Sequence, residues 1–211
     1  TTPAMIASNR GDIKMLQLLE DIGVDLRWKN TDGQDALSCA KDPATEKHLR
    51  AVSTKKEKQD KRCAAETRKL AESGQAAAQF ALGRILENGQ GVQRSMVDAA
   101  LWYRKSALQG NPNAQLSLAG CCLEGNGVAK DPKEGAHWCK KGVADRGDLD
   151  ETLVQEIIDK VVRSGNLECL QQLQSIITPS STNFGDGGHT AMHVAAENGQ
   201  LGPMKWLHEH L

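Results

Sequence analysis

Two repeat periods run through this chain of 211 residues, and one of them lies between the two parts of the other. The stretch 2–7 returns in a weaker form at 35–40, a spacing of 33 residues. Six residues recur at a constant spacing of 36: Ala78, Leu82, Gly89, Gly91, Val92 and Trp102 return as Ala114, Leu118, Gly125, Gly127, Val128 and Trp138. A short unit repeated at a fixed period predicts a solenoid, whose core forms by stacking of neighbouring units.

The composition favours helices as the repeated element. Aromatic residues make up only 3% of the chain, which suits closely packed short helices better than strands, where aromatic and β-branched residues are favoured. The 26 basic residues balance 27 acidic ones, so no overall field attracts nucleic acid or an anionic membrane. Apolar runs are too short to span a bilayer. We therefore expect an all-α helical-repeat solenoid with short hairpin turns, no nucleic-acid partner and no membrane insertion.

The period of 36 predicts pairs of helices joined by a tight loop. In the first copy, 79–83 belong to the first helix, 89–92 to the loop and 98–107 to the second helix. The Gly-x-Gly-Val loop followed by a Trp on the second helix resembles the Sel1-like repeat, a relative of the tetratricopeptide helix pair. The resemblance covers 64–149, where 64–73 resembles the second helix of a preceding half repeat. It departs from the family at Cys122, where an aromatic residue is common, and at Ser95, which replaces the loop Asp.

The period of 33 has a different resemblance. Residues 11–25 are similar to the second helix and following turn of an ankyrin repeat, and 188–199 contain the tetrapeptide Thr-Ala-Met-His that opens such a repeat. The resemblance implies ankyrin-like repeats at 1–52, as the end of an array, and again at 150–211. It also implies a hydrogen bond between Thr190 and His193. We expect one helix, about 150–164, to serve both the Sel1-like and the ankyrin-like block.

A charged stretch at 53–63 separates the first two blocks. It could be a basic patch for nucleic acid or nuclear import, or a solvated helix that links two blocks. Glu57 and Asp60 interleave with the lysines, which favours the solvated helical linker.

Residues that suggest chemistry have structural explanations. The two Gly-x-Gly loops lack the third glycine of a dinucleotide loop, since Arg94 and Lys130 stand there, and no strand precedes them. Adjacent Cys121 and Cys122 point to different faces of a helix, and two histidines two residues apart diverge, so neither pair predicts a metal site. The six cysteines are expected to be reduced, mostly buried thiols. We expect no enzyme activity, cofactor or metal.

The resemblance implies a protein–protein interaction scaffold with a concave groove. Trp102 and Trp138 are expected to pack between repeats, so that Trp102→Ala would cost about 3–5 kcal/mol. Six residues are candidates for partner contact, two as loop aromatics and four as outward positions of the first Sel1-like helices: Trp28, Phe184, Gln79, Arg84, Gln115 and Ser117.

Two other functions remain open on the sequence. The chain could be a regulatory or substrate-recruiting region of a larger enzyme, or a structural subunit of a large assembly. It begins without Met and stops within an ankyrin-like pattern, so we expect a fragment of a longer protein, with the cytoplasm as its expected location.

Overall fold

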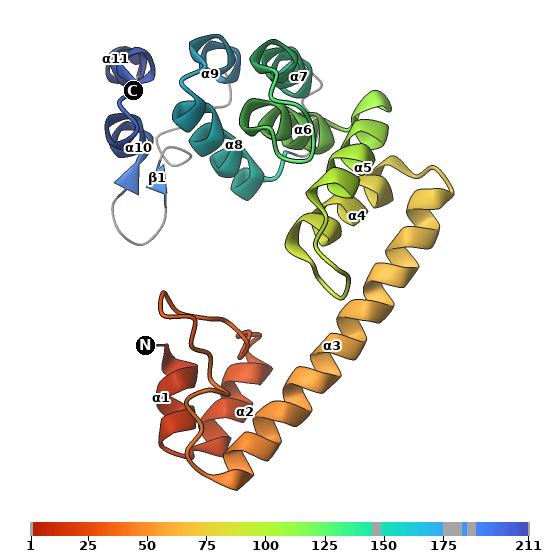
Figure 1. Ribbon diagram of the computed structural model, residues 1–211, viewed down its shortest axis with the longest axis vertical. Coiled ribbons are helices and arrows are strands. Elements are labelled where there is room, and N and C mark those ends of the chain that lie inside the picture. Colours follow the sequence, from red (N-terminus) through yellow and green to blue (C-terminus); the bar gives the residue numbers. More distant parts are fainter. Residues whose placement is uncertain (1, 145–148, 175–182, 185–188, 211) are drawn as a thin grey trace. The chain divides into compact units, whose positions relative to one another are not determined.

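The computed structural model describes residues 2–144, 149–174, 183–184 and 189–210 (Figure 1). Among these residues there are eleven helices and one antiparallel pair of two-residue strands. The all-α expectation is therefore confirmed. The chain divides into two compact units, Thr1–Cys63 and Ala64–Leu211, which are described separately.

The first unit contains helix α1 (Pro3–Asn9), helix α2 (Ile13–Asp21) and the first part of helix α3 (Pro43–Glu72). Thr2 caps α1 by accepting from the backbone N–H of Met5, and Asp12 caps α2 in the same way. The segment 22–42 connects α2 to α3 without regular secondary structure. The apolar core of this unit takes residues from both the helices and this segment: Ala4, Ala7, Leu16, Leu19, Leu26, Ala36 and Leu49.

Helix α3 is longer than the sequence suggested. The expected short helix at about 44–52 and the stretch 53–63 are one continuous helix that ends at Glu72. The stretch 53–63 is solvent-exposed along most of its length, in agreement with the solvated helix expected there.

The repeats of 36 residues form two antiparallel helix pairs in the second unit. Helix α4 (Ala76–Asn88) packs on α5 (Met96–Leu108), and α6 (Pro112–Glu124) packs on α7 (Pro132–Ala144). Gly89 and Gly125 end α4 and α6 in the left-handed conformation, with φ of 69° and 79°. These two glycines of the period are therefore helix caps.

The rest of the second unit continues the stack of helices. It contains α8 (Glu151–Ser164), α9 (Leu167–Leu173), strands β1 (Asn183–Phe184) and β2 (His189–Thr190), α10 (Ala191–Glu197) and α11 (Leu201–His210). Helix α8 packs on α6, α9 and α10. Helix α8 therefore packs on both sides, and one apolar core runs from Ala71 to Leu207. The assignment of the block after it to ankyrin-like repeats stays a prediction.

Candidate partner-binding surfaces

Gln79, Gln115 and Ser117 do not face outward, which corrects the sequence-based prediction. Each is at most 5% exposed. The Nε2 atom of Gln79 donates to the carbonyl oxygen of Ala71 (3.2 Å), and Nε2 of Gln115 donates to that of Ala107 (3.2 Å). Both carbonyls lie in the last turn of the preceding helix, where each also accepts from the backbone N–H three residues further on, that of Gly74 or Gly110. The glutamines therefore connect each helix pair to the helix before it.

A sequence signal for this role was present. The two glutamines are 36 residues apart, and so are the two carbonyl groups that accept from them. A polar residue that recurs with the core positions can serve the stacking itself, because the carbonyl groups at the end of a stacked helix can accept a second hydrogen bond from the next helix.

Arg84 takes part in a network of charges that links α4 to α8. Its guanidinium donates to both carboxylate oxygens of Glu156, at 2.7 and 3.3 Å. Glu87 lies 3.9 Å from Arg84 and 3.8 Å from Lys160, and it accepts a hydrogen bond from the hydroxyl of Tyr103. Burial is the main cause that raises the pKa of Tyr103, and the charge of Glu87 adds to it. The half-buried Arg84 thus pairs within the fold and does not form a free groove contact.

The tryptophans of the period pack as predicted, but to different extents. Trp138 is buried, and its Nε1 donates to Glu134 (3.2 Å). Trp102 is only partly buried against the same core. Glu134 also pairs with Arg104 of α5 at 2.7 Å, and this hydrogen bond is the main reason that the pKa of Glu134 is lowered. Glu134 therefore connects α7 to α5, and Trp138 supports this carboxylate from within α7.

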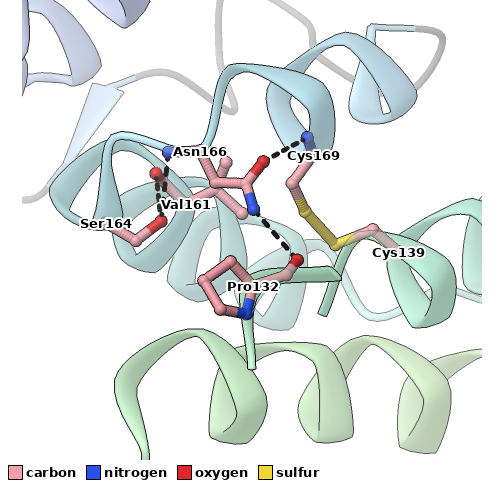
Figure 2. The surroundings of a disulfide bond; sticks show 6 residues. All are labelled: Pro132, Cys139, Val161, Ser164, Asn166 and Cys169. Atoms are coloured by element: carbon pink, nitrogen blue, oxygen red, sulfur yellow. Dashed lines mark hydrogen bonds between the residues drawn. A yellow bond between two sulfur atoms is a disulfide. The ribbon is translucent and has the colours of Figure 1, made fainter. Parts of the chain in front are cut away.

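Two of the six cysteines are joined in a disulfide, which corrects the expectation of reduced thiols. Cys139 of α7 bonds to Cys169 of α9, with their Cα atoms 6.2 Å apart (Figure 2). Asn166 supports the same contact, because its Oδ1 accepts from the backbone of Cys169 (2.9 Å) and its Nδ2 donates to the carbonyl of Pro132 (3.1 Å). The sequence shows a spacing of 30 residues but not that α9 packs on α7, which is what brings the sulfurs together.

The remaining cysteines are free, and burial distinguishes them. Cys121 and Cys122 are buried, Cys39 is partly buried and Cys63 is exposed. Burial is the main cause that raises the pKa of Cys121 to about 12 and that of Cys122 to about 11. Both buried groups are therefore neutral thiols at physiological pH, and a thiol is a much poorer nucleophile than a thiolate.

Reduction of the disulfide is expected to lower the free energy of unfolding of the second unit by about 3–4 kcal/mol, because the bond closes a loop of about 30 residues in the unfolded chain. Urea unfolding followed by circular dichroism, with and without reductant, measures this difference. The double variant Cys139→Ser/Cys169→Ser is the control, since reductant should leave its stability unchanged. Equal stability of the unsubstituted protein with and without reductant would contradict the prediction.

The first unit contains a cavity of about 360 Å³ between the segment after α2 and helix α3. Its apolar lining comes from five aliphatic residues: Val24, Leu26, Leu37, Leu49 and Val52. Leu26 and Leu49 are buried members of the core of this unit, so the cavity opens directly onto that core. Six charged residues also line it: Glu20, Asp25, Arg27, Asp35, Lys55 and Lys56.

Arg27 holds the segment after α2 against α3 at this cavity. Its guanidinium donates to Asp25 (3.1 and 3.2 Å) and to Asp60 of α3 (3.2 Å). The hydrogen bond with Arg27 is the main cause that lowers the pKa of Asp25, so this carboxylate stays ionised at neutral pH. Lys55 lies 4.0 Å from Glu20 and closes a second charge pair at the cavity. These charge pairs thus hold α2 and the segment after it against α3, around the aliphatic lining of the cavity.

The two predicted aromatic contact residues have different outcomes. Trp28 directly follows Arg27 and is 60% exposed. Phe184 lies in β1, but its side chain is outside the described residues, as is that of Thr190, so the expected hydrogen bond to His193 is untested. Of the six candidates for partner contact, Trp28 is the one that the described residues show as an exposed aromatic side chain.

The described residues indicate neither a metal centre nor a membrane span. In this part of the chain, no three His, Cys, Asp or Glu side chains are grouped so that they could hold a metal ion. None of the described helices combines the length and the apolar character that crossing a bilayer requires.

Comparison with known proteins identifies the repeats of 36 residues. The family model described as Sel1 repeat matches residues 76–111 and 112–144. No curated protein matches the chain. Nothing in the comparisons supports ankyrin repeats at 1–52 or 150–211.

Two solved structures are similar to the chain. One is a Sel1 repeat protein from Oxalobacter formigenes, with 25% identity, a TM-score of 0.41 and coverage of 69% of this chain and 68% of that one. The other is c5321, a protective antigen present in uropathogenic Escherichia coli strains and displaying an SLR fold, with 25% identity and a TM-score of 0.40. That match covers 87% of this chain and 44% of the antigen. Residues 76–144 are two Sel1 repeats, in a helical-repeat architecture generally associated with protein interactions.

Proposed function

We propose that this protein is a non-enzymatic interaction scaffold that binds a segment of a protein partner in the cavity of its first unit. The observation that carries the proposal is the aliphatic lining of this cavity, bordered by paired charges. The exposed Trp28 follows the lining residue Arg27 in the chain. Binding sites combine an apolar surface with a few placed polar groups, and exposed Trp residues are frequent anchors of protein interfaces. A peptide side chain that enters the cavity would remove apolar surface of both molecules from water.

The proposal includes the ankyrin-like interpretation of the flanking regions. Its support is local: α1 and α2 form a pair of short helices followed by a connecting segment, and α10 and α11 form a pair preceded by the β1–β2 hairpin. In this interpretation the Sel1 repeats lie along the chain between the two ankyrin-like blocks, with 53–63 as the linking stretch. Partner contact then involves the segment after α2 and not the buried glutamines of the Sel1 helices.

The polar groups at the cavity favour binding over catalysis. Arg27 is engaged with Asp25 and Asp60, and Lys55 lies beside Glu20. Charges that pair with one another in this way fix the position of the side chains that line the cavity and contribute specificity. A general acid or base needs, in addition, a proton-transfer path to a bound group.

Selection from a random 12-residue peptide library on the immobilised protein tests the proposal. We expect an enriched group of peptides whose affinity falls at least tenfold in Val24→Glu, because a carboxylate would then stand in the apolar lining. Ile22→Glu is the matched control, since Ile22 is also exposed but does not line the cavity. Failure to enrich any peptides, or an equal loss of affinity in both variants, would refute binding at this cavity.

A further inference from the structure

We propose that helices α8–α11 form a block that opens from the Sel1 repeats as a hinge, with the disulfide as its pivot and two ion pairs in the other layer of helices as its latch. This inference concerns the second unit and does not depend on the cavity of the first. It starts from the two layers of the stack. Helices α6, α8 and α10 pack side by side in one layer, and α7, α9 and α11 pack side by side in the other (Figure 1).

The latch lies in the layer of α6 and α8. Arg84 of α4 pairs with Glu156 of α8 at 2.7 Å. Lys160 of α8 lies 3.8 Å from Glu87 of α4. The two ion pairs connect the first Sel1 repeat directly to the block, although α6 comes between α4 and α8 in the order of first helices and packs on α8. We call these two ion pairs the latch.

A glycine of α6 makes room for the latch. Arg84, Gly120 and Lys160 each precede the glycine that caps their helix by five residues, so they occupy the same position of α4, α6 and α8. A Cβ atom added to Gly120 would lie 3.0 Å from the Cδ atom of Lys160. The side chain of Lys160 therefore extends over this glycine toward Glu87, where a larger residue of α6 would stand in its path.

The latch favours the closed arrangement because its charges are partly shielded from water. The side chains of Glu87 and Lys160 are only 16% and 20% exposed. Ion pairs in such surroundings are screened less by salt than surface pairs, and removal of one partner leaves the other charge desolvated and unpaired. Opening of the block is therefore governed by these side chains together with the apolar contact between α6 and α8.

The pivot lies in the other layer of the stack. The disulfide joins Cys139 of α7 to Cys169 of α9, and Asn166 adds its hydrogen bond to the carbonyl oxygen of Pro132 in the same region (Figure 2). The covalent bond keeps α7 and α9 together when the latch opens. The motion that remains is a rotation about this edge, which separates α8 from α6.

Two buried free thiols of α6 can report this motion. Burial is the main cause that raises the pKa of both Cys121 and Cys122. The next cause is the charge of Lys160 for Cys121, whose pKa it lowers, and the charge of Glu134 for Cys122, whose pKa it raises. Cys121 therefore lies on the side of α6 toward the latch, and Cys122 on the side toward α7. Local opening at the latch exposes Cys121 to a thiol reagent and leaves Cys122 covered.

Labelling with N-ethylmaleimide in the absence of reductant, followed by tandem mass spectrometry, tests the inference. We expect Arg84→Glu to speed the labelling of Cys121 at least tenfold relative to that of Cys122, because a carboxylate would then face Glu156. The charge swap Arg84→Glu/Glu156→Arg should slow this labelling again at least threefold. Arg104→Glu is the matched control, because it makes the same charge change in an ion pair of 2.7 Å between α5 and α7.

The pivot has its own test. Cys139→Ser/Cys169→Ser, added to Arg84→Glu, should speed the labelling of Cys121 at least a further tenfold, because the covalent limit on opening is then gone. Circular dichroism verifies that each variant folds, and Glu156→Gln replaces Arg84→Glu as a milder change if the latter does not fold.

Three results would overturn the inference. Equal acceleration at Cys121 and Cys122 in Arg84→Glu would mean that the unit loosens as a whole and not at the latch. Labelling that stays fast in the charge swap would show that Arg84 does not act through Glu156. Labelling of Cys121 that is unchanged by loss of the disulfide would show that the bond is not the pivot.

Discussion

Gly127→Ala is expected to lower the free energy of unfolding of the second unit by about 3–5 kcal/mol. Gly127 has a φ of 74°, where a Cβ atom is strained. The added Cβ would also collide with the carbonyl oxygen of Met96 and lie 2.8 Å from the amide nitrogen of Val97. These are backbone atoms at the start of α5, so no side chain can move aside. The loop of the second Sel1 repeat would have to shift away from the first repeat.

Gly110→Ala separates the two causes. Gly110 belongs to the same unit and has a φ of 86°, but an added Cβ would meet no atom within 4 Å. This variant should therefore lose only the strain energy, about 1–2 kcal/mol. Urea unfolding followed by circular dichroism gives both values by linear extrapolation. If the two variants lost equal stability, the contact between the Gly127 loop and α5 would not contribute to the fold.

The Sel1 repeats could be predicted in detail from the sequence because each of their features occurs twice. The constant spacing of 36 residues aligns Gly89 with Gly125 and Trp102 with Trp138. Equivalent positions in stacked repeats have equivalent surroundings, so the helices, the glycine-containing loops between them and the packing of the tryptophans followed.

The same periodicity did not distinguish buried from exposed polar residues. Gln79 and Gln115 occupy outward-looking positions by register, yet they are buried because they donate to the last carbonyl groups of the preceding helices. Helical periodicity describes one helix and its apolar face, whereas a hydrogen bond from a side chain to the preceding helix forms only when two helix ends meet.

Features that depend on contacts between distant segments could not be predicted. The bond between Cys139 and Cys169 requires α9 to pack on α7, and the cavity of the first unit requires Arg27 to hold an irregular segment against Asp60 of α3. Neither pair has a counterpart at the repeat spacing. Trp28 could be proposed as a contact residue because an aromatic side chain in a turn has no packing role in the repeat, and the fold shows it exposed. The cavity that its neighbour Arg27 lines could not be predicted.

Trp138→Ala is expected to cost about 3–5 kcal/mol, more than the equivalent change at Trp102. Trp138 is only 4% exposed and packs in the core that joins α5, α6 and α7. Its removal leaves a cavity and takes one hydrogen-bond donor from Glu134. Trp102→Ala should cost about 1–2 kcal/mol, because part of that ring already contacts water, and this value replaces the larger cost expected from sequence.

The two tryptophans form a matched pair, since they occupy the same position of consecutive repeats. A Lys ammonium lies over each ring, at 4.0 Å for Trp102 and 5.1 Å for Trp138, so a cation–π interaction cannot explain a larger loss at Trp138. Trp138→Phe keeps most of the ring but removes the donor to Glu134. Its loss, measured in the same urea titration, should lie between those of the two alanine variants. Equal losses at Trp102 and Trp138 would mean that burial within the stack does not determine what each repeat contributes to stability.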